Sequence, residues 1–218
     1  MKTFRPSAAI FDMDGLMLDT ERPFIRLWAE TGKKFGYDVP PEVVKRMVGI
    51  SNDNCRIIML KEYGEDFPFD KILEEFRDIS KKEFEKGIPV KKGLLNLLDH
   101  FTAAKIPMGV ATSTRKTTAE RMLTIAGIKE RFNAITGGDE VENGKPAPDI
   151  FLLAAKRLGY LPCECVGFED SPAGLKGLYS AGIKSVFIKD LIEPPQEILA
   201  SVWKRCVDLD EAVQLFDF

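Results

Sequence analysis

The chain has 218 residues, 31 of them basic and 34 acidic, so its net charge is −3, and 44% of its residues are hydrophobic. This balance excludes a chain disordered as a whole, and the lack of a basic excess argues against a protein that follows nucleic-acid backbones. Residues 1–7 hold no signal-peptide core and no run approaches the roughly 18 apolar residues of a membrane span, so we expect a cytoplasmic protein without a membrane partner. We also expect no nucleic-acid partner, and a monomer is the default expectation.

Five short apolar runs are bounded by turn residues, which is the pattern of fully buried parallel strands. They occupy residues 7–11, 106–111, 134–135, 165–168 and 184–188. Helical patterns alternate with the later runs, at residues 93–104, 117–126, 149–158 and 172–181. Strands that alternate with helices of about ten residues predict an α/β fold with a doubly wound parallel sheet.

The stretch from residue 22 to residue 87 breaks this alternation. It contains no convincing buried strand, and apolar residues recur there with the period of about 3.6 residues that marks amphipathic helices. The expected helices span residues 24–35, 41–47, 52–62 and 70–86. We therefore predict a core domain of residues 1–21 and 88–218, with a helical cap domain of residues 22–87 inserted after the first strand.

Two pairs of acidic residues follow predicted strands. Asp12 and Asp14 come directly after the first strand, and Glu169 and Asp170 follow the strand at 165–168. Ligands of open α/β sheets bind outside the carboxyl ends of the strands, where buried carboxylates are unfavourable unless a cation such as Mg²⁺ neutralises them. The pairs indicate a metal site, although a solvated acidic turn or a favourable helix dipole would explain either pair alone.

Hydroxyl groups and a lysine complete the set of polar residues at strand ends. Thr112, Ser113 and Thr114 follow the second strand, and Lys145 lies in the stiff loop GKPAPD. Hydroxyls and backbone amides ahead of a helix can hold an anion, and a fixed lysine can bind a phosphate and an aspartate together. Helix capping and an exposed loop lysine are the ordinary alternatives. Four such features in chain order predict an active site for phosphate chemistry.

The chain resembles the haloacid dehalogenase-like hydrolase superfamily, whose four motifs match Asp12-x-Asp14, Thr112, Lys145 and Glu169-Asp170. The segments FDMDGLMLDTE, GKPAPDIF and FEDSPAG resemble the branch that contains β-phosphoglucomutases and small-metabolite phosphatases. The resemblance runs from Ile10 to about Ile188. It implies a Rossmann-like core that carries an α-helical cap.

The resemblance also implies a role for each motif residue. Asp12 would attack phosphorus and form an aspartyl-phosphate. Asp14 would act first as general acid on the leaving oxygen and then as base on water. Thr112 and the amide of Ser113 would hold the phosphoryl oxygens, and Lys145 would stabilise charge on Asp12 and on the transferring group.

Magnesium is the cofactor that the resemblance implies. Its ligands would be Asp12, the main-chain carbonyl of Asp14, and Asp170, with Glu169 in or beside the metal shell. A carboxylate and a phosphate dianion repel each other, so positive charge between them is needed before Asp12 can attack.

The cap separates phosphatases from phosphomutases in this branch. β-Phosphoglucomutases carry a histidine five residues after the aspartate of the DT or DS pair, and counted from Asp19 that position is Phe24. They carry an arginine three residues after a cap-loop glycine, and counted from Gly49 that position is Asn52. The arginine holds the far phosphate of a bisphosphate, and without it a second phosphate is poorly held. We therefore favour a phosphatase for a small phosphorylated metabolite, with sugar phosphates as the first class, and keep a β-phosphoglucomutase-type mutase as the alternative.

Two interpretations from other functional classes stay open. A phosphoacceptor signalling domain also combines acidic residues, a hydroxyl and a lysine on a doubly wound sheet, but such a domain is shorter and lacks a helical insertion. A non-catalytic binding protein on the same fold would require a broken motif, and none is broken here.

Overall fold

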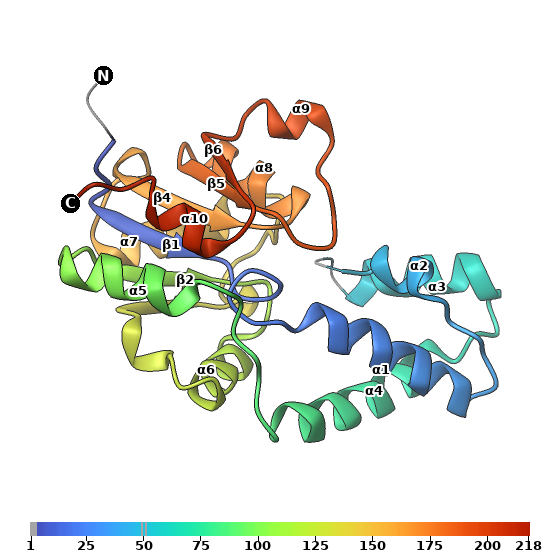
Figure 1. Cartoon of the computed structure of the whole chain (residues 1–218). Coiled ribbons are helices and arrows are strands. Elements are labelled where there is room, and N and C mark those ends of the chain that lie inside the picture. Colours follow the sequence, from blue (N-terminus) through green and yellow to red (C-terminus); the bar gives the residue numbers. More distant parts are fainter. Residues whose placement is uncertain (1–3, 49, 51) are drawn as a thin grey trace.

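The computed structural model describes residues 4–48, 50 and 52–218. In this part of the chain six parallel strands form one sheet in the order β3-β2-β1-β4-β5-β6 (Figure 1). The strands are β1 (Ala8–Phe11), β2 (Met108–Ala111), β3 (Ala134–Thr136), β4 (Cys165–Glu169), β5 (Lys184–Ile188) and β6 (Lys204–Cys206). The chain starts in the middle of the sheet, builds one edge, and returns beside β1 to build the other. This is the doubly wound topology that the sequence predicts.

Helices cover both faces of the sheet. One face carries α5 (Leu94–Ala103), α6 (Lys116–Ile125) and α10 (Leu209–Val213), and the other carries α7 (Asp149–Leu158) and α8 (Pro172–Ser180). Alternate side chains of a strand point to opposite faces. Accordingly, Ala9 and Phe11 belong to the first hydrophobic core, whereas Ala8 and Ile10 belong to the second. All four are fully buried, which explains why the first strand is a continuous apolar run.

The described insertion between β1 and α5 consists of helices α1 (Glu21–Lys34), α2 (Pro41–Lys45), α3 (Asn52–Tyr63) and α4 (Phe69–Phe84). They project from one side of the sheet and bury a hydrophobic cluster of their own (Figure 1). Trp28 stacks on both Phe69 and Phe76, with ring centroids 5.9 and 5.1 Å apart. The helical cap that the sequence predicts is therefore present, while its exact boundaries stay a prediction.

The sheet extends past the last predicted strand. Helix α9 (Gln196–Leu199), strand β6 and helix α10 follow β5, and short 3₁₀ turns lie at Lys129–Arg131, Gly138–Glu140 and Pro162–Glu164. Strand β6 reads Lys-Arg-Cys, and its two basic residues are exposed at the sheet edge. It has no apolar run from which a strand could be predicted.

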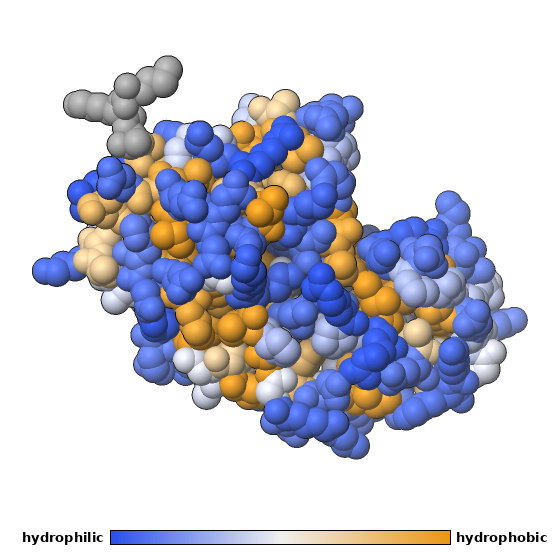
Figure 2. Space-filling view, in the orientation of Figure 1, coloured by the Kyte–Doolittle hydropathy of each residue, from blue (hydrophilic) through white to orange (hydrophobic). Residues whose placement is uncertain are grey.

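The surface is mostly polar on the side that Figure 2 shows. Hydrophilic side chains cover most of this face, and hydrophobic ones lie in patches between them. Throughout the described residues, no helix is long and apolar enough to cross a membrane.

We expect Trp28→Ala to lower the free energy of unfolding by about 3–5 kcal/mol, because it removes a buried indole from the centre of the cap cluster. Urea unfolding followed by circular dichroism measures the change. The matched control is Ile57→Ala in α3, whose residue is 62% exposed, and this change should stay within about 0.5 kcal/mol. Equal effects of the two substitutions would contradict a separate cap core.

Candidate active site

The register of the sheet brings the predicted site residues together. Phe11, the last residue of β1, lies opposite Val110 of β2 and Phe168 of β4. Asp12 continues this ladder by donating its amide hydrogen to the carbonyl of Phe168 at 3.0 Å. Both predicted acidic pairs and the loop after β2 therefore meet at the carboxyl edge of the three central strands, as doubly wound sheets require of a ligand site.

Lys145 connects the two acidic pairs. Its ammonium forms an ion pair with Asp12 and another, at 2.6 Å, with Glu169, and only 4% of its side chain is exposed. Burial alone lowers the pKa of Lys145, but the charges of Asp12 and Glu169 outweigh this effect and raise the pKa well above its ordinary value. The lysine is therefore a permanent positive charge beside the predicted nucleophile.

Asp12, Glu169 and Asp170 form an acidic cluster in which one carboxylate oxygen of each lies within 4.8 Å of the others. All three residues are buried. Burial, and after it the charges of neighbouring carboxylates, raise the pKa of Asp12 and of Asp170, although Lys145 counters the rise at Asp12. Oδ1 of Asp170 is buried and receives no hydrogen bond from the described residues. Buried oxygen ligands without sufficient donors fit a divalent cation such as Mg²⁺.

Glu169 is oriented by the groups around it. Its Oε1 accepts from Lys145 at 2.6 Å, and its Oε2 accepts from the amides of Asp170 at 2.8 Å and Ser171 at 2.7 Å. A Cβ on Gly174 would lie 1.5 Å from Oε1 of Glu169, so the carboxylate packs where only glycine leaves room. This geometry makes Glu169 the partner that holds Lys145 in place, and its membership of the metal shell stays a prediction.

Three hydroxyl groups hold Asp14. Its Oδ1 accepts from Thr20 at 3.0 Å, and its Oδ2 accepts from Thr112 at 3.2 Å and Thr114 at 2.8 Å. The predicted phosphate ligand Thr112 thus also orients the predicted acid. Sequence reasoning missed Thr20, although it stands in the segment FDMDGLMLDTE, and it named Thr114 only as part of the hydroxyl loop, without this contact to Asp14.

Two glycines support the loop after β2. Gly138 donates its amide hydrogen to the carbonyl of Thr114 at 3.0 Å, and a Cβ there would lie 2.3 Å from the carbonyl oxygen of Ser113. Gly137 is as closely packed, because its Cβ would lie 2.3 Å from the amide nitrogen of Lys116. The exposed side chain of Ser113 leaves this loop open to a ligand. The glycine pair directly follows β3, a signal that sequence reasoning missed.

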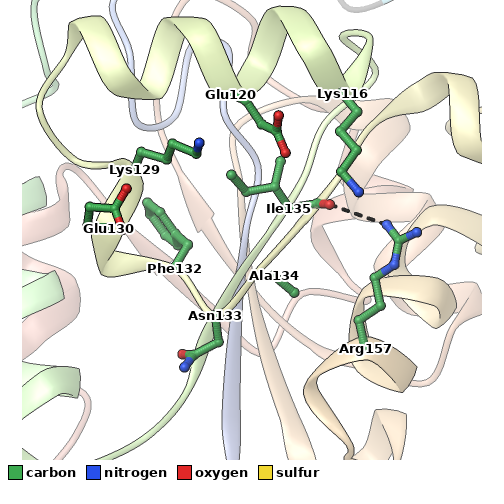
Figure 3. Close-up of a pocket in the computed structure, with 9 residues that line it drawn as sticks. All are labelled: Lys116, Glu120, Lys129, Glu130, Phe132, Asn133, Ala134, Ile135 and Arg157. Carbon is green, nitrogen blue, oxygen red and sulfur yellow. Dashed lines mark hydrogen bonds between the residues drawn. The ribbon is translucent and has the colours of Figure 1, made fainter.

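Glu140 ties this loop to the sheet edge. Its carboxylate accepts two hydrogen bonds from Arg157, at 2.8 and 2.9 Å, and others from Lys116 at 3.2 Å and from the amide of Gly137 at 3.0 Å. The hydrogen bonds from Arg157 lower the pKa of Glu140 to about 2. Arg157 also donates to the carbonyl of Ile135 in β3 at 3.3 Å (Figure 3). Arg157 therefore stabilises the loop after β2 indirectly, through its hydrogen bonds to Glu140.

A surface hollow of about 420 Å³ lies beside this network (Figure 3). Among its lining residues, Lys116 and Arg157 are already bonded to Glu140. None of the predicted site residues lines it. The predicted site residues thus lie at the strand ends and not in this hollow.

The two predicted cap residues are Phe24 and Asn52. Phe24 is partly buried and packs against Phe76 and Trp28, with ring centroids 5.2 and 6.3 Å away. Asn52 is exposed at the first position of α3. Gly49, from which the Asn52 comparison is counted, lies outside the described residues. Contact of Phe24 or Asn52 with a substrate stays a prediction.

A second acidic cluster adjoins the first. One carboxylate oxygen each of Glu21, Asp170 and Asp190 lies within 4.8 Å of the others. Burial, followed by the nearby charge of Asp190, raises the pKa of Glu21 to about 8. Glu21 and Asp190 were not among the predicted site residues. A signal existed for each, since Glu21 ends the segment FDMDGLMLDTE and Asp190 stands two residues after β5.

Comparison with known families identifies the class. A family profile described as "Haloacid dehalogenase-like hydrolase" matches residues 9–188. The chain belongs to this family, which confirms the resemblance inferred from the motifs. A solved β-phosphoglucomutase from Clostridium difficile superposes with a TM-score of 0.80 at 25% sequence identity, covering 95% of this chain and 93% of that one.

Two curated relatives are similar over most of their length. The phosphorylated carbohydrates phosphatase of Thermotoga maritima is 28% identical over 180 residues, which cover 83% of each chain. The fructose-1-phosphate phosphatase YqaB of Escherichia coli K12 is 30% identical over 187 residues, which cover 85% of this chain and 97% of the relative.

Glu140→Gln should lower the free energy of unfolding by about 1 kcal/mol at pH 7, because the charged hydrogen bonds from Arg157 weaken. The folded pKa of Glu140, about 2, is below its ordinary value of 4.5. Its stabilisation is therefore full above about pH 4.5 and is lost as the pH falls toward 2. Urea unfolding at pH 7, 5, 4 and 3 should show the difference from wild type shrinking below pH 5.

The matched control for this measurement is Glu130→Gln, an exposed residue that lines the same hollow. It should differ little from wild type at every pH. A Glu140→Gln difference that stays constant down to pH 3 would contradict the proposed role of its charge.

Proposed function

We propose that this protein is a magnesium-dependent phosphomonoester hydrolase that acts on a small phosphorylated metabolite through an aspartyl-phosphate on Asp12. The observation that carries the proposal is the buried ion pair of Asp12 with Lys145 at the carboxyl edge of the sheet, beside the acidic cluster and with Asp14 two residues away. Family membership and the two phosphatase relatives support the same reaction class.

In the first half of the reaction a carboxylate oxygen of Asp12 forms a bond to phosphorus as the bond from phosphorus to the leaving oxygen breaks. Asp14 gives its proton to that leaving oxygen. Lys145 remains charged throughout and offsets negative charge on Asp12 and on the phosphoryl group. The hydroxyl of Thr112 and the amide of Ser113, in the loop after β2, would hold the phosphoryl oxygens.

In the second half, Asp14 takes a proton from water, whose oxygen then attacks phosphorus and releases inorganic phosphate from Asp12.

A magnesium ion bound by Asp12, Asp170 and the carbonyl of Asp14, with Glu169 beside it, would supply positive charge that lets a carboxylate approach a phosphate dianion. The hydroxyls of Thr20 and Thr114 keep Asp14 close to the reacting group.

Sugar phosphates are the proposed substrate class. Support comes from the two relatives, whose names place carbohydrate phosphates among their substrates. The fold also resembles a β-phosphoglucomutase, so a phosphomutase is the second candidate. Hydrolysis is favoured because Asn52 stands in place of the arginine that would hold a second phosphate, and Phe24 stands in place of the mutase histidine. A monomeric state and a cytoplasmic location complete the proposal as expectations.

Purified protein should release phosphate from p-nitrophenyl phosphate and from some sugar phosphates with Mg²⁺, and EDTA should abolish the release. Asp12→Asn should lower kcat by at least about 1,000-fold, because an amide is a poor nucleophile. The control Asp99→Asn changes a carboxylate that is 68% exposed and pairs with Arg131 on the surface, and it should leave kcat unchanged. Phosphate release is measured colorimetrically.

The panel should include β-glucose 1-phosphate with a catalytic amount of its bisphosphate, fructose 1-phosphate and pseudouridine 5′-phosphate. Faster formation of glucose 6-phosphate than of free phosphate would establish the mutase instead. If no substrate in the panel released phosphate, the catalytic proposal would fail and a binding or signalling role would replace it.

A further inference from the structure

The second acidic cluster, Glu21, Asp170 and Asp190, shares Asp170 with the first. Glu21 begins the insertion on α1, whereas Asp190 follows β5 in the core, so the fold brings them together at Asp170 from distant parts of the chain. Gly15 lies between two of these side chains. A Cβ there would lie 2.4 Å from Oδ2 of Asp170 and 2.9 Å from Oε1 of Glu21.

Three oxygens of this cluster, one on each residue, lack hydrogen-bond donors among the described residues. Oε2 of Glu21, Oδ1 of Asp170 and Oδ2 of Asp190 are all buried, and no described residue donates a hydrogen bond to any of them. Glu21 is 7% and Asp170 4% exposed, and the side chain of Asp190 is 4% exposed. Buried carboxylate oxygens without donors are strongly unfavourable, so these three atoms suit a ligand that donates hydrogen bonds or carries positive charge.

Positive charge from the protein reaches only one side of the cluster. Lys91 and Arg22 contact Oδ1 of Asp190, at 2.6 and 3.4 Å, while Oδ2 of the same carboxylate is one of the unpaired atoms. Lys91 therefore orients Asp190 through one oxygen, and the other oxygen of this carboxylate stays without a donor from the described residues. In the described chain no lysine or arginine forms an ion pair with Glu21.

We propose that Glu21 and Asp190 form the outer coordination sphere of the metal that Asp12 and Asp170 bind, accepting hydrogen bonds from the water molecules on that metal. This inference rests on the proposed function, since it deepens the same site. Mg²⁺ is usually bound in proteins by one or two carboxylates and keeps several water ligands. Each such water has two hydrogens to donate, and the unpaired oxygens of Glu21 and Asp190 are acceptors next to a metal ligand.

A carboxyl group at position 21 suits this role, because its unpaired oxygen can accept a hydrogen bond from metal-bound water. Outer-sphere partners orient the inner ligands and add negative charge near the ion, and their loss typically weakens metal binding about 10- to 100-fold. Asp170 connects Glu21 and Asp190 to the metal site, because it belongs to both clusters. Glu21 and Asp190 are thus positioning residues that act through the metal and its water.

The test is Mg²⁺ binding by the metal-stripped protein, measured by isothermal titration calorimetry with MgCl₂. Glu21→Gln and Asp190→Asn should each raise the Mg²⁺ dissociation constant about tenfold or more. The matched control is Glu193→Gln, three residues from Asp190, whose side chain is 58% exposed and pairs with Lys189. It should bind Mg²⁺ like wild type. Dissociation constants within twofold of wild type for both test variants would overturn the proposal.

Thermal unfolding separates this role from a merely structural one. Without metal, Glu21→Gln should melt at the same temperature as wild type or higher, because one carboxylate is removed from a repelling cluster. With Mg²⁺, its rise in melting temperature should be smaller than that of wild type. A lower melting temperature of the metal-free variant together with an unchanged rise would overturn the proposal.

The number of bound ions gives a second decision. Titration of the wild-type protein with Mn²⁺, followed by electron paramagnetic resonance, should show one tightly bound ion per chain. Two tight ions would mean that Glu21 and Asp190 hold a cation of their own, which overturns an outer-sphere role. None of these readouts needs turnover. Normal metal binding without phosphate release would refute the proposed function and leave this inference standing.

Discussion

The buried ammonium of Lys145 is the interaction on which the site depends. Asp12 directly follows β1, and Glu169 is the last residue of the neighbouring strand β4. Both residues are buried in a sheet that helices cover on both faces, so their carboxylates cannot be solvated as they would be at a surface. Lys145 contacts both of them from the loop ahead of α7. One positive charge does not balance the carboxylates gathered there, and the remaining deficit is the physical reason to expect a divalent cation.

The sheet and its neighbouring loops determine where this charge is placed. Pairing of β1 with β2 and β4 sets three strand ends level, so the proposed nucleophile Asp12, the hydroxyl loop and the acidic cluster lie side by side. The loop after β2 keeps its shape because Gly137 and Gly138 allow another backbone to approach it closely. The two hydrogen bonds from Arg157 to Glu140 then stabilise that contact at the edge of the sheet. Precise positioning is what phosphoryl transfer chiefly asks of a protein.

The two segments that connect the helical insertion to the core are part of the same network. Leu18 in the first segment forms an isolated β-bridge with Val90 in the second, so the two segments lie side by side. Thr20 holds Asp14, and the next residue, Glu21, reaches the acidic cluster around Asp170. The insertion is therefore attached to the core through residues that also contact the candidate catalytic groups, which gives a physical route between cap position and site geometry.

The sequence alone determined the class of fold and the helical insertion, and it predicted the motif residues from Asp12 to Asp170, because apolar periodicity and strand-end residues are local properties of the chain. Strand β6 escaped prediction because an edge strand with exposed basic residues has no such local pattern. Only the tertiary structure brought Glu21 and Asp190 to Asp170, and only it revealed the glycine support behind Ser113. Both depend on packing between distant segments, where proximity, burial and missing hydrogen-bond donors arise only after the chain has folded.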